Sequence, residues 1–209
     1  TETMIHGRSN VGSLDAGIHL PPIFTQSLAR HLVDAAAFED LLRRFREDIV
    51  TVIDQITSQV SAQQQTKARL QPQPMRSLLI DDCIDAGQEF NAGGARYNWS
   101  VINVAGLATV VDSLAAVREV VFERQQISAA RLLEILSHDF EDDEALRQRL
   151  TRCPRFGNDD AAADQLAIDL SGFIFRQLLD RTPWRGGRFL PSCLMFTTYA
   201  QAGKPVGAT

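Results

Sequence analysis

The stretch 91–123 constrains the fold of this chain more than any other, because three local patterns follow one another in it. Gly93 and Gly94 lack Cβ atoms, so the backbone there can turn tightly or let another backbone approach. The aromatic and β-branched run 96–102 then predicts a buried strand. Apolar residues recur at spacings of three and four across 104–122, which predicts a helix that is apolar around most of its circumference. A strand that leads into such a helix is typical of a larger α/β protein.

The end of the chain repeats the first two of these patterns. Gly186 and Gly187 precede the apolar run 189–199, which predicts a second buried strand. Pro191 near its start suits the beginning of a strand better than the interior of a ladder. Two strands that each follow a glycine pair, with helices between them, predict the strands and crossover helices of an α/β barrel or sheet.

Five further stretches carry the spacing that predicts helices. They are 34–60, 75–86, 128–139, 142–152 and 159–179. Asp34 and Ser128 are suited to cap the first turns of their helices, and the acidic pair Asp159-Asp160 to cap the last one. In the helix 75–86 we expect the apolar side chains to point inward; these are Leu78, Leu79, Cys83 and Ile84. Residues 58–66 are rich in Gln, Ser and Thr, and we expect them to extend the first of these helices toward solvent and then to fray.

Residues 1–24 have no periodicity and contain Pro21-Pro22, so we expect an irregular lead-in. Residues 25–209 are predicted to hold the helices, with strands near 96–103 and 189–198, all within one domain. The chain begins without Met and stops in the Gly/Pro-rich run 203–209, and we therefore expect an excerpt of a longer protein.

Charge and composition exclude several classes of function. The formal net charge of the 209 residues is -5 with scattered Lys and Arg, which predicts no nucleic-acid partner and no anionic membrane surface. No apolar run approaches the roughly 20 residues that span a bilayer, and residues 1–20 lack the apolar core of a signal peptide. Cys83, Cys153 and Cys193 are odd in number and far apart, which predicts free thiols and a cytoplasmic location.

No catalytic residue or metal ligand is predicted from the residue patterns alone. Asp81 and Asp82 are adjacent on the expected helix, so their side chains point about 100° apart and do not converge on one ion. Gly203-Lys204 lacks the remaining residues of a P-loop, and the glycines 93–94 come before their strand rather than after it, unlike a dinucleotide fingerprint.

Taken together, several short motifs resemble the glycyl radical enzyme superfamily, the pyruvate formate-lyase-like proteins, over residues 36–209. In chain order they are Pro74–Leu78, Asp82–Gly87, Gly93–Asn98, Ala105–Leu107, Asp112–Val117, Phe156–Asp160 and Gly203–Thr209. The Gly-Gly-Ala-Arg-Tyr-Asn form at 93–98 is more similar to the dehydratase and lyase branch than to formate acetyltransferase, a transferase. The resemblance implies that this α/β chain is a helix-rich portion, with few strands, of the family's ten-stranded barrel.

The resemblance also implies chemistry that these residues do not carry. Family members form a thiyl radical on the cysteine of a Gly-Cys-Val-Glu loop and store a glycyl radical in an Arg-Val-x-Gly-Tyr loop. A partner enzyme that uses S-adenosylmethionine and an iron–sulfur cluster installs that radical. Neither loop is in this chain, and the contexts of its three cysteines do not match the first. We therefore expect the segment to be inactive alone, with no cofactor bound directly, and to work with the remainder of its parent chain.

For this segment the resemblance implies a structural role beside a small-molecule substrate. The family strand that matches 190–198 lines the substrate cavity, and strand alternation puts Leu194 and Phe196 on one face, so these two residues are the predicted lining. A homodimer is expected for the parent. Two other functions stay open: a helical binding or scaffold module that uses the apolar stripe of residues 38–60, and a truncated gene product.

Overall fold

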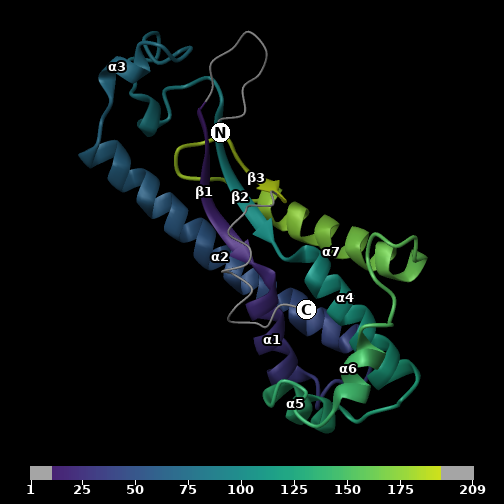
Figure 1. The fold of residues 1–209 in the computed structure, drawn as a ribbon. Helices are drawn as coiled ribbons and strands as arrows, with labels where there is room; N and C mark the ends of the chain where they lie inside the picture. The colour runs from purple at the N-terminus through teal and green to yellow at the C-terminus, as the bar shows by residue number, and fades with distance from the viewer. Residues whose placement is uncertain (1–10, 194–209) are drawn as a thin grey trace. The chain divides into compact units, whose positions relative to one another are not determined.

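A computed structural model describes residues 11–193 of the chain, in which three strands are separated by long helical stretches (Figure 1). The strands are β1 (Val11–His19), β2 (Asn98–Ala105) and β3 (Arg188–Ser192). The helices are α1 (Leu20–His31), α2 (Phe38–Leu70), α3 (Pro74–Ser77), α4 (Leu107–Val117), α5 (Ala129–Ser137), α6 (Glu144–Leu150) and α7 (Ala161–Leu179). A 3₁₀ turn (Phe90–Ala92) precedes β2, and a π-helical turn (Arg118–Glu123) continues α4.

The strands form one sheet in the order β1-β2-β3, so β2 lies in the centre. β2 and β3 run parallel, with Trp99 opposite Arg188 and Asn103 opposite Ser192. Parallel neighbours need a long crossover connection, and here the chain between them contains α4 to α7. The two strands predicted from the glycine pairs are therefore present and adjacent, with residues beyond 193 outside the described range.

The chain divides into two units. The described part of the first consists of residues 11–18, 50–105 and 173–193, and that of the second of residues 19–49 and 106–172. Among the described residues, the first unit holds the sheet except for the last residue of β1, and the regular elements of the second unit are helices.

In the first unit, the residues of α2 from 50 onward pack one face into the core. Ile53, Thr57, Val60 and Gln64 are all buried and follow one another at intervals of four, three and four, which is one face of an α-helix. Two members of this face are polar, so the packing requires hydrogen-bond partners for them.

The core of the second unit is built around aromatic side chains. Phe24 of α1 meets Phe45 of α2 edge to face, with ring centroids 5.2 Å apart. α1 also packs against α4, whose first turn follows Gly106. Gly106 has φ +81°, and a Cβ there would lie 2.4 Å from Cδ of Pro21, so only glycine fits this junction.

The prediction that residues 1–24 are irregular is wrong for residues 11–24. This part forms β1 and the start of α1. Pro21 and Pro22 occupy the first turn of α1, where the missing N–H has no intrahelical partner to lose, so the proline pair begins a helix instead of preventing one.

The predicted helix 34–60 is present but has different ends. It begins at Phe38 and continues to Leu70. The amide of Leu41 donates to the carbonyl of Ala37, so Asp34 lies in the preceding turn and is not the cap. The Gln-rich part after Val60 stays helical because Gln64 is a core residue and not a solvated one.

The predicted helix 75–86 is wrong in extent and in orientation. Only the single turn α3 is helical, and non-helical turns follow it. Leu78, Leu79 and Ile84 are exposed, while Cys83 is buried with Phe90 and Ala95 as a small cluster. Asp82 has φ +75°, a left-handed conformation that interrupts a helix.

The remaining helices confirm their predictions with ends shifted by a few residues. The Ser128 side chain accepts a hydrogen bond from the amide of Arg131 and caps α5. At the start of α7, one carboxylate oxygen of Asp160 accepts from the amides of Ala162 and Ala163, at 3.0 and 3.1 Å. Asp160 thus has the capping role that its position predicts, and the cap is formed by this one member of the acidic pair.

We expect Asp160→Ala to lower the free energy of unfolding by about 1 kcal/mol, since two amides at the start of α7 lose their acceptor. Urea denaturation of the intact protein checks this. Asp160→Asn keeps an acceptor oxygen and is expected to recover most of the loss. A variant Asp160→Ala with unchanged stability would show that solvent satisfies these amides equally well.

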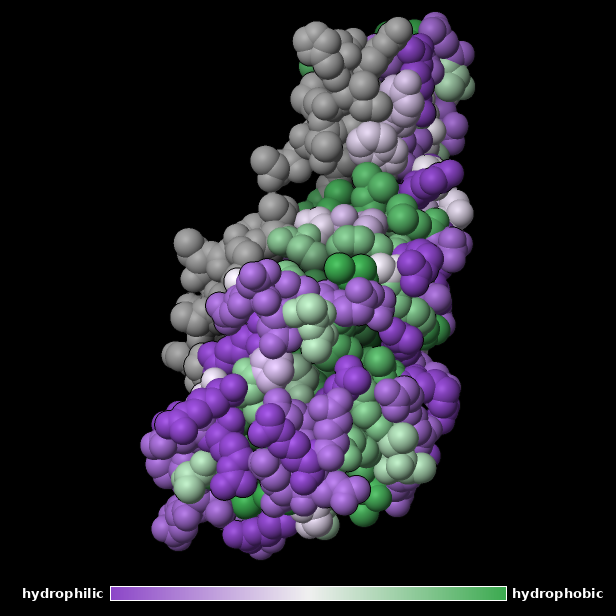
Figure 2. Space-filling view, turned by 90° about the vertical axis from the view of Figure 1, so that its right-hand side faces the viewer, coloured by the Kyte–Doolittle hydropathy of each residue, from purple (hydrophilic) through white to green (hydrophobic). Residues whose placement is uncertain are grey.

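Polar side chains cover most of the face seen in Figure 2, interrupted by apolar areas. Within residues 11–193, none of the helices combines the length and the apolar character needed to cross a membrane.

Candidate functional site

One face of the β2–β3 pair is buried, and α2 contacts it through Gln64. The Gln64 side-chain amide donates to the Ser100 hydroxyl at 2.6 Å, and Ser100 is 0% exposed. Phe189 is opposite Ser100 in the register and is also 0% exposed. Because alternate residues of a strand point to the same face, Ile102 belongs with Ser100, and it too is fully buried. This face is packed core.

The opposite face of the same two strands is only partly covered. Its side chains belong to Trp99, Val101, Asn103, Arg188, Leu190 and Ser192, which we call the open face. Trp99, Val101, Leu190 and Ser192 are partly exposed, whereas Asn103 is buried. The open face therefore combines apolar side chains with one amide, one hydroxyl and, at its far end, the exposed Arg188.

The polar members of the open face are bonded to each other. Asn103 and Ser192 are register partners, and the Ser192 hydroxyl donates to the Asn103 side-chain oxygen at 3.2 Å. Both lie at or near the carboxyl ends of their parallel strands. In α/β sheets this end is where ligands are bound.

At the other end of the strands, the buried Gln64 side chain connects three segments. Besides donating to Ser100, its amide nitrogen lies 3.4 Å from Asp15, and its oxygen accepts from the backbone amide of Arg185 at 3.0 Å. The Arg185 guanidinium donates to the Trp99 carbonyl at 3.0 Å and lies 4.0 Å from the Asp15 carboxylate. The two charged side chains are only 6% and 8% exposed, so they are a desolvated pair that fixes β1 and β2 to the turn before β3.

At this end of the sheet, one glycine of each pair lies close to the backbone of the segment that contains the other pair or its strand. Gly93 has φ +96°, and a Cβ there would be 2.6 Å from the Arg185 carbonyl oxygen. Gly187 has φ +77°, and its Cβ would be 1.3 Å from the Asn98 carbonyl oxygen. Each pair therefore permits the backbone of the other strand to approach closely.

The predicted lining residues Leu194 and Phe196 lie outside the described residues. In the sequence they follow Leu190 and Ser192 at intervals of two, which is the strand period of the open face. The structure brings together five residues that the sequence prediction did not name as site residues; they are Asp15, Gln64, Asn103, Arg185 and Ser192.

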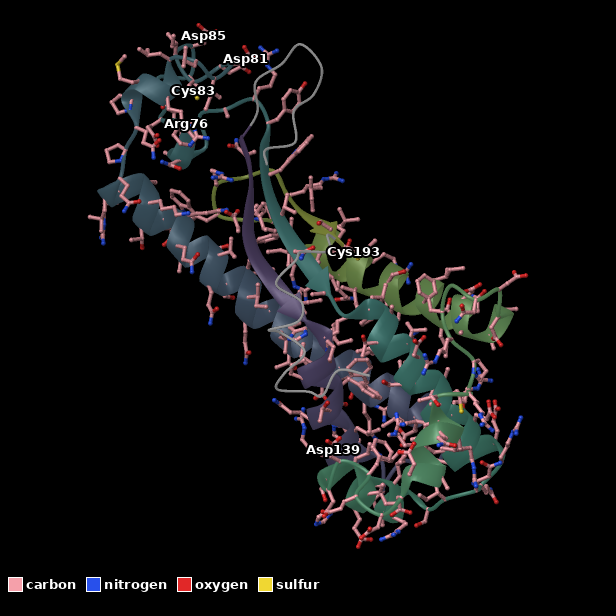
Figure 3. The ribbon with its side chains drawn as sticks, in the orientation of Figure 1. Arg76, Asp81, Cys83, Asp85, Asp139 and Cys193 are labelled. Atoms are coloured by element: carbon pink, nitrogen blue, oxygen red, sulfur yellow. The ribbon has the colours of Figure 1, made fainter. Side chains whose placement is uncertain are left out.

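The cysteines do not form a reactive centre. Cys83 lies among the loops that follow α3, with Arg76, Asp81 and Asp85 nearby, and Cys193 follows β3 (Figure 3). Burial raises the pKa of the Cys83 thiol, with the carboxylates of Glu89 and Asp82 acting in the same direction. Burial also raises the pKa of Cys193. All three thiols are free, as the sequence predicts.

Of the adjacent carboxylates Asp81 and Asp82, the second is engaged in an ion pair. The Asp82 carboxylate is paired with the Arg96 guanidinium through both of its oxygens. This pairing raises the pKa of Arg96 above its ordinary value, chiefly through the hydrogen bond to Asp82. Among residues 11–193, no group of three or more potential ligand side chains is arranged for a metal.

Comparison with known proteins identifies the family. Residues 25–203 match the family model described as pyruvate formate lyase-like. The chain belongs to this family. It is thus a member of the glycyl radical enzyme superfamily, and the prediction of a helix-rich α/β portion of that superfamily's barrel is confirmed by solved structures.

Three relatives illustrate the match. The trans-4-hydroxy-L-proline dehydratase of Clostridioides difficile is 29% identical over 174 residues, which are 83% of this chain and 22% of the relative. The crystal structure of hydroxyproline dehydratase from the same organism, with trans-4-hydroxy-L-proline bound, superposes with a TM-score of 0.88 at 26% identity, covering 92% of this chain and 26% of that one. The glycerol-bound B12-independent glycerol dehydratase of Clostridium butyricum gives a TM-score of 0.81 at 26% identity, covering 84% of this chain and 24% of that one. The chain therefore spans about a quarter of the length of these relatives.

Proposed function

We propose that this chain serves a glycyl radical dehydratase or lyase by forming part of the wall of its substrate cavity. The one-sided burial of the β2–β3 pair carries the proposal. In an α/β barrel the helices cover the outer face of the strands, and the other face looks into the interior. Since the face of Ser100 and Phe189 is fully buried and is bonded to α2 through Gln64, we take the open face as the inward one.

In this proposal the open face both excludes water and contacts the substrate. Trp99, Val101 and Leu190 give it an apolar surface that excludes water from a reactive intermediate. Leu194 and Phe196, next in the strand period, extend that surface toward the substrate. The substrate is a small hydroxylated molecule, as the names of the two dehydratase relatives indicate for those proteins.

The residues of this chain do not supply the radical groups. Cys83 and Cys153 are buried, and Cys193 stands in Pro-Ser-Cys-Leu, not in Gly-Cys-Val-Glu. We propose that the thiyl cysteine and the radical-bearing glycine come from other parts of a longer chain, and that a separate activating enzyme installs the radical. The contribution of this segment is to bind, orient and exclude water.

The test uses the intact protein, activated anaerobically by its activating enzyme. Electron paramagnetic resonance is expected to detect a glycyl radical, and glycerol or trans-4-hydroxy-L-proline to be converted. Leu194→Trp, which adds bulk at the proposed wall, is expected to lower kcat/KM at least about tenfold while the radical signal is unchanged. Ile168→Trp is the matched control, because Ile168 is exposed on α7.

Two results would contradict the proposal. Absence of a glycyl radical after activation would remove the enzymatic function. A Leu194→Trp variant with the kcat/KM of the unmodified protein would remove Leu194 from the cavity wall and leave the enzymatic function in place.

A further inference from the structure

The polar pair on the open face has a location that a scaffold does not require. Asn103 is 6% exposed, and its neighbours on that face are the apolar side chains of Val101 and Leu190. Burying an amide is unfavourable unless its polar atoms are hydrogen-bonded, and an apolar residue would pack there at no such cost. The amide is retained together with a partner, Ser192, whose hydroxyl donates to it at 3.2 Å.

The pair also lies at the carboxyl ends of the strands, where α/β sheets bind ligands. Asn103 is two residues before the end of β2 and Ser192 is the last residue of β3. Gln64 and Ser100 form a second amide–hydroxyl pair, which is fully within the core on the opposite face and joins α2 to β2. The structure thus contains two similar pairs, of which one faces a helix and the other faces the open side of the sheet.

We propose that Asn103 and Ser192 form an anchor that binds a hydroxyl group of the substrate. This rests on the proposed function, in which the open face looks into the cavity. The Ser192 proton is directed at Asn103, so the Ser192 oxygen presents lone pairs that accept a hydrogen bond from the substrate hydroxyl. Asn103 is the positioning residue, since it fixes the orientation of the serine hydroxyl.

The chemistry of the pair selects the class of substrate group. Both side chains are neutral, and Arg188, the charged residue on the same side of β3, is four residues before Ser192, about 13 Å along a strand. At this distance Arg188 cannot form an ion pair with a carboxylate or sulfonate that is bound at Ser192. The neutral pair therefore favours a neutral hydroxyl as its ligand.

The experiment compares the two pairs in the intact, activated protein, with the hydroxylated substrate that it converts. Ser192→Ala is expected to raise KM about tenfold, the effect of one lost hydrogen bond to a ligand, with little change in melting temperature. Ser100→Ala, on the face covered by α2, is expected to lower the melting temperature and leave KM unchanged. Ser192→Thr keeps the hydroxyl and is expected to restore most of the affinity.

Each result has a defined meaning. A Ser192→Ala variant with unchanged KM, or a Ser192→Thr variant as impaired as Ser192→Ala, overturns the anchor while the radical signal and turnover of the unmodified protein sustain the proposed function. Absence of both radical and turnover in the unmodified protein overturns the proposed function and the anchor together.

Discussion

Gly187→Ala is expected to lower the free energy of unfolding by about 4 kcal/mol or more, one of the two largest single-residue effects in this chain. Gly187 has φ +77°, and the new Cβ would lie 1.3 Å from the carbonyl oxygen of Asn98. This neighbour is backbone of the central strand, so it cannot move aside as the end of a flexible side chain can. Relief of the overlap requires β3 to separate from β2, and urea denaturation of the intact protein measures the cost.

Gly186→Ala is the matched control for this prediction. Gly186 has φ +88°, but a Cβ there would meet nothing within 4 Å. The control therefore carries only the cost of a left-handed conformation, about 1–2 kcal/mol. Equal losses in the two variants would mean that backbone conformation alone explains the glycine pair, and that the close approach of the strands is not limiting.

Local sequence patterns correctly predicted those helices and strands whose conformation does not depend on contacts with distant parts of the chain. The helix predicted over 104–122 is present as α4 and the π-helical turn after it, although Val104 and Ala105 belong to β2. This helix and the strands at the two glycine pairs are strongly apolar, which favours their burial. The caps at Ser128 and Asp160 depend on contacts within three residues, and both are present. The identification of the family also depended on short local motifs, which explains why it could be made without tertiary structure.

The errors occurred where a local signal has two meanings. A proline pair ends one helix and begins another equally well, and in α1 it begins one. The run after Met75 has helical spacing, yet the left-handed Asp82 and its pairing with Arg96 make it a series of turns. The spacing of apolar residues does not reveal that Asp82 and Arg96 will form an ion pair.

The buried polar network at the sheet could not be predicted for a different reason. Its members are separated by up to 170 positions in sequence, from Asp15 to Arg185, and each looks like a surface residue by type. One signal was available: Gln64 continues the apolar stripe of Ile53 and Val60 at the helical interval. A polar residue at a core position of a helix indicates a buried hydrogen-bond network and not the solvated end of a helix.

Arg185→Met is expected to destabilise the protein by about 3–5 kcal/mol, because it leaves the buried Asp15 carboxylate without the positive charge beside it. The Trp99 carbonyl also loses a hydrogen-bond donor at 3.0 Å. Arg147→Met is the matched control; the Arg147 side chain is half exposed and pairs with Glu144 on the surface of α6, where such pairs contribute at most about 1 kcal/mol. Thermal and urea denaturation of the intact protein provide the comparison.

The double variant Asp15→Asn with Arg185→Met separates charge from packing. If the loss in Arg185→Met comes from removing the positive charge beside the Asp15 carboxylate, neutralising Asp15 recovers a large part of it, so the two substitutions are strongly non-additive. If the losses simply add, the arginine acts through its hydrogen bond to Trp99 and its packing alone. Recovery would establish that a single desolvated ion pair connects β1, β2 and the turn before β3, and thereby fixes the strands from which the open face is built.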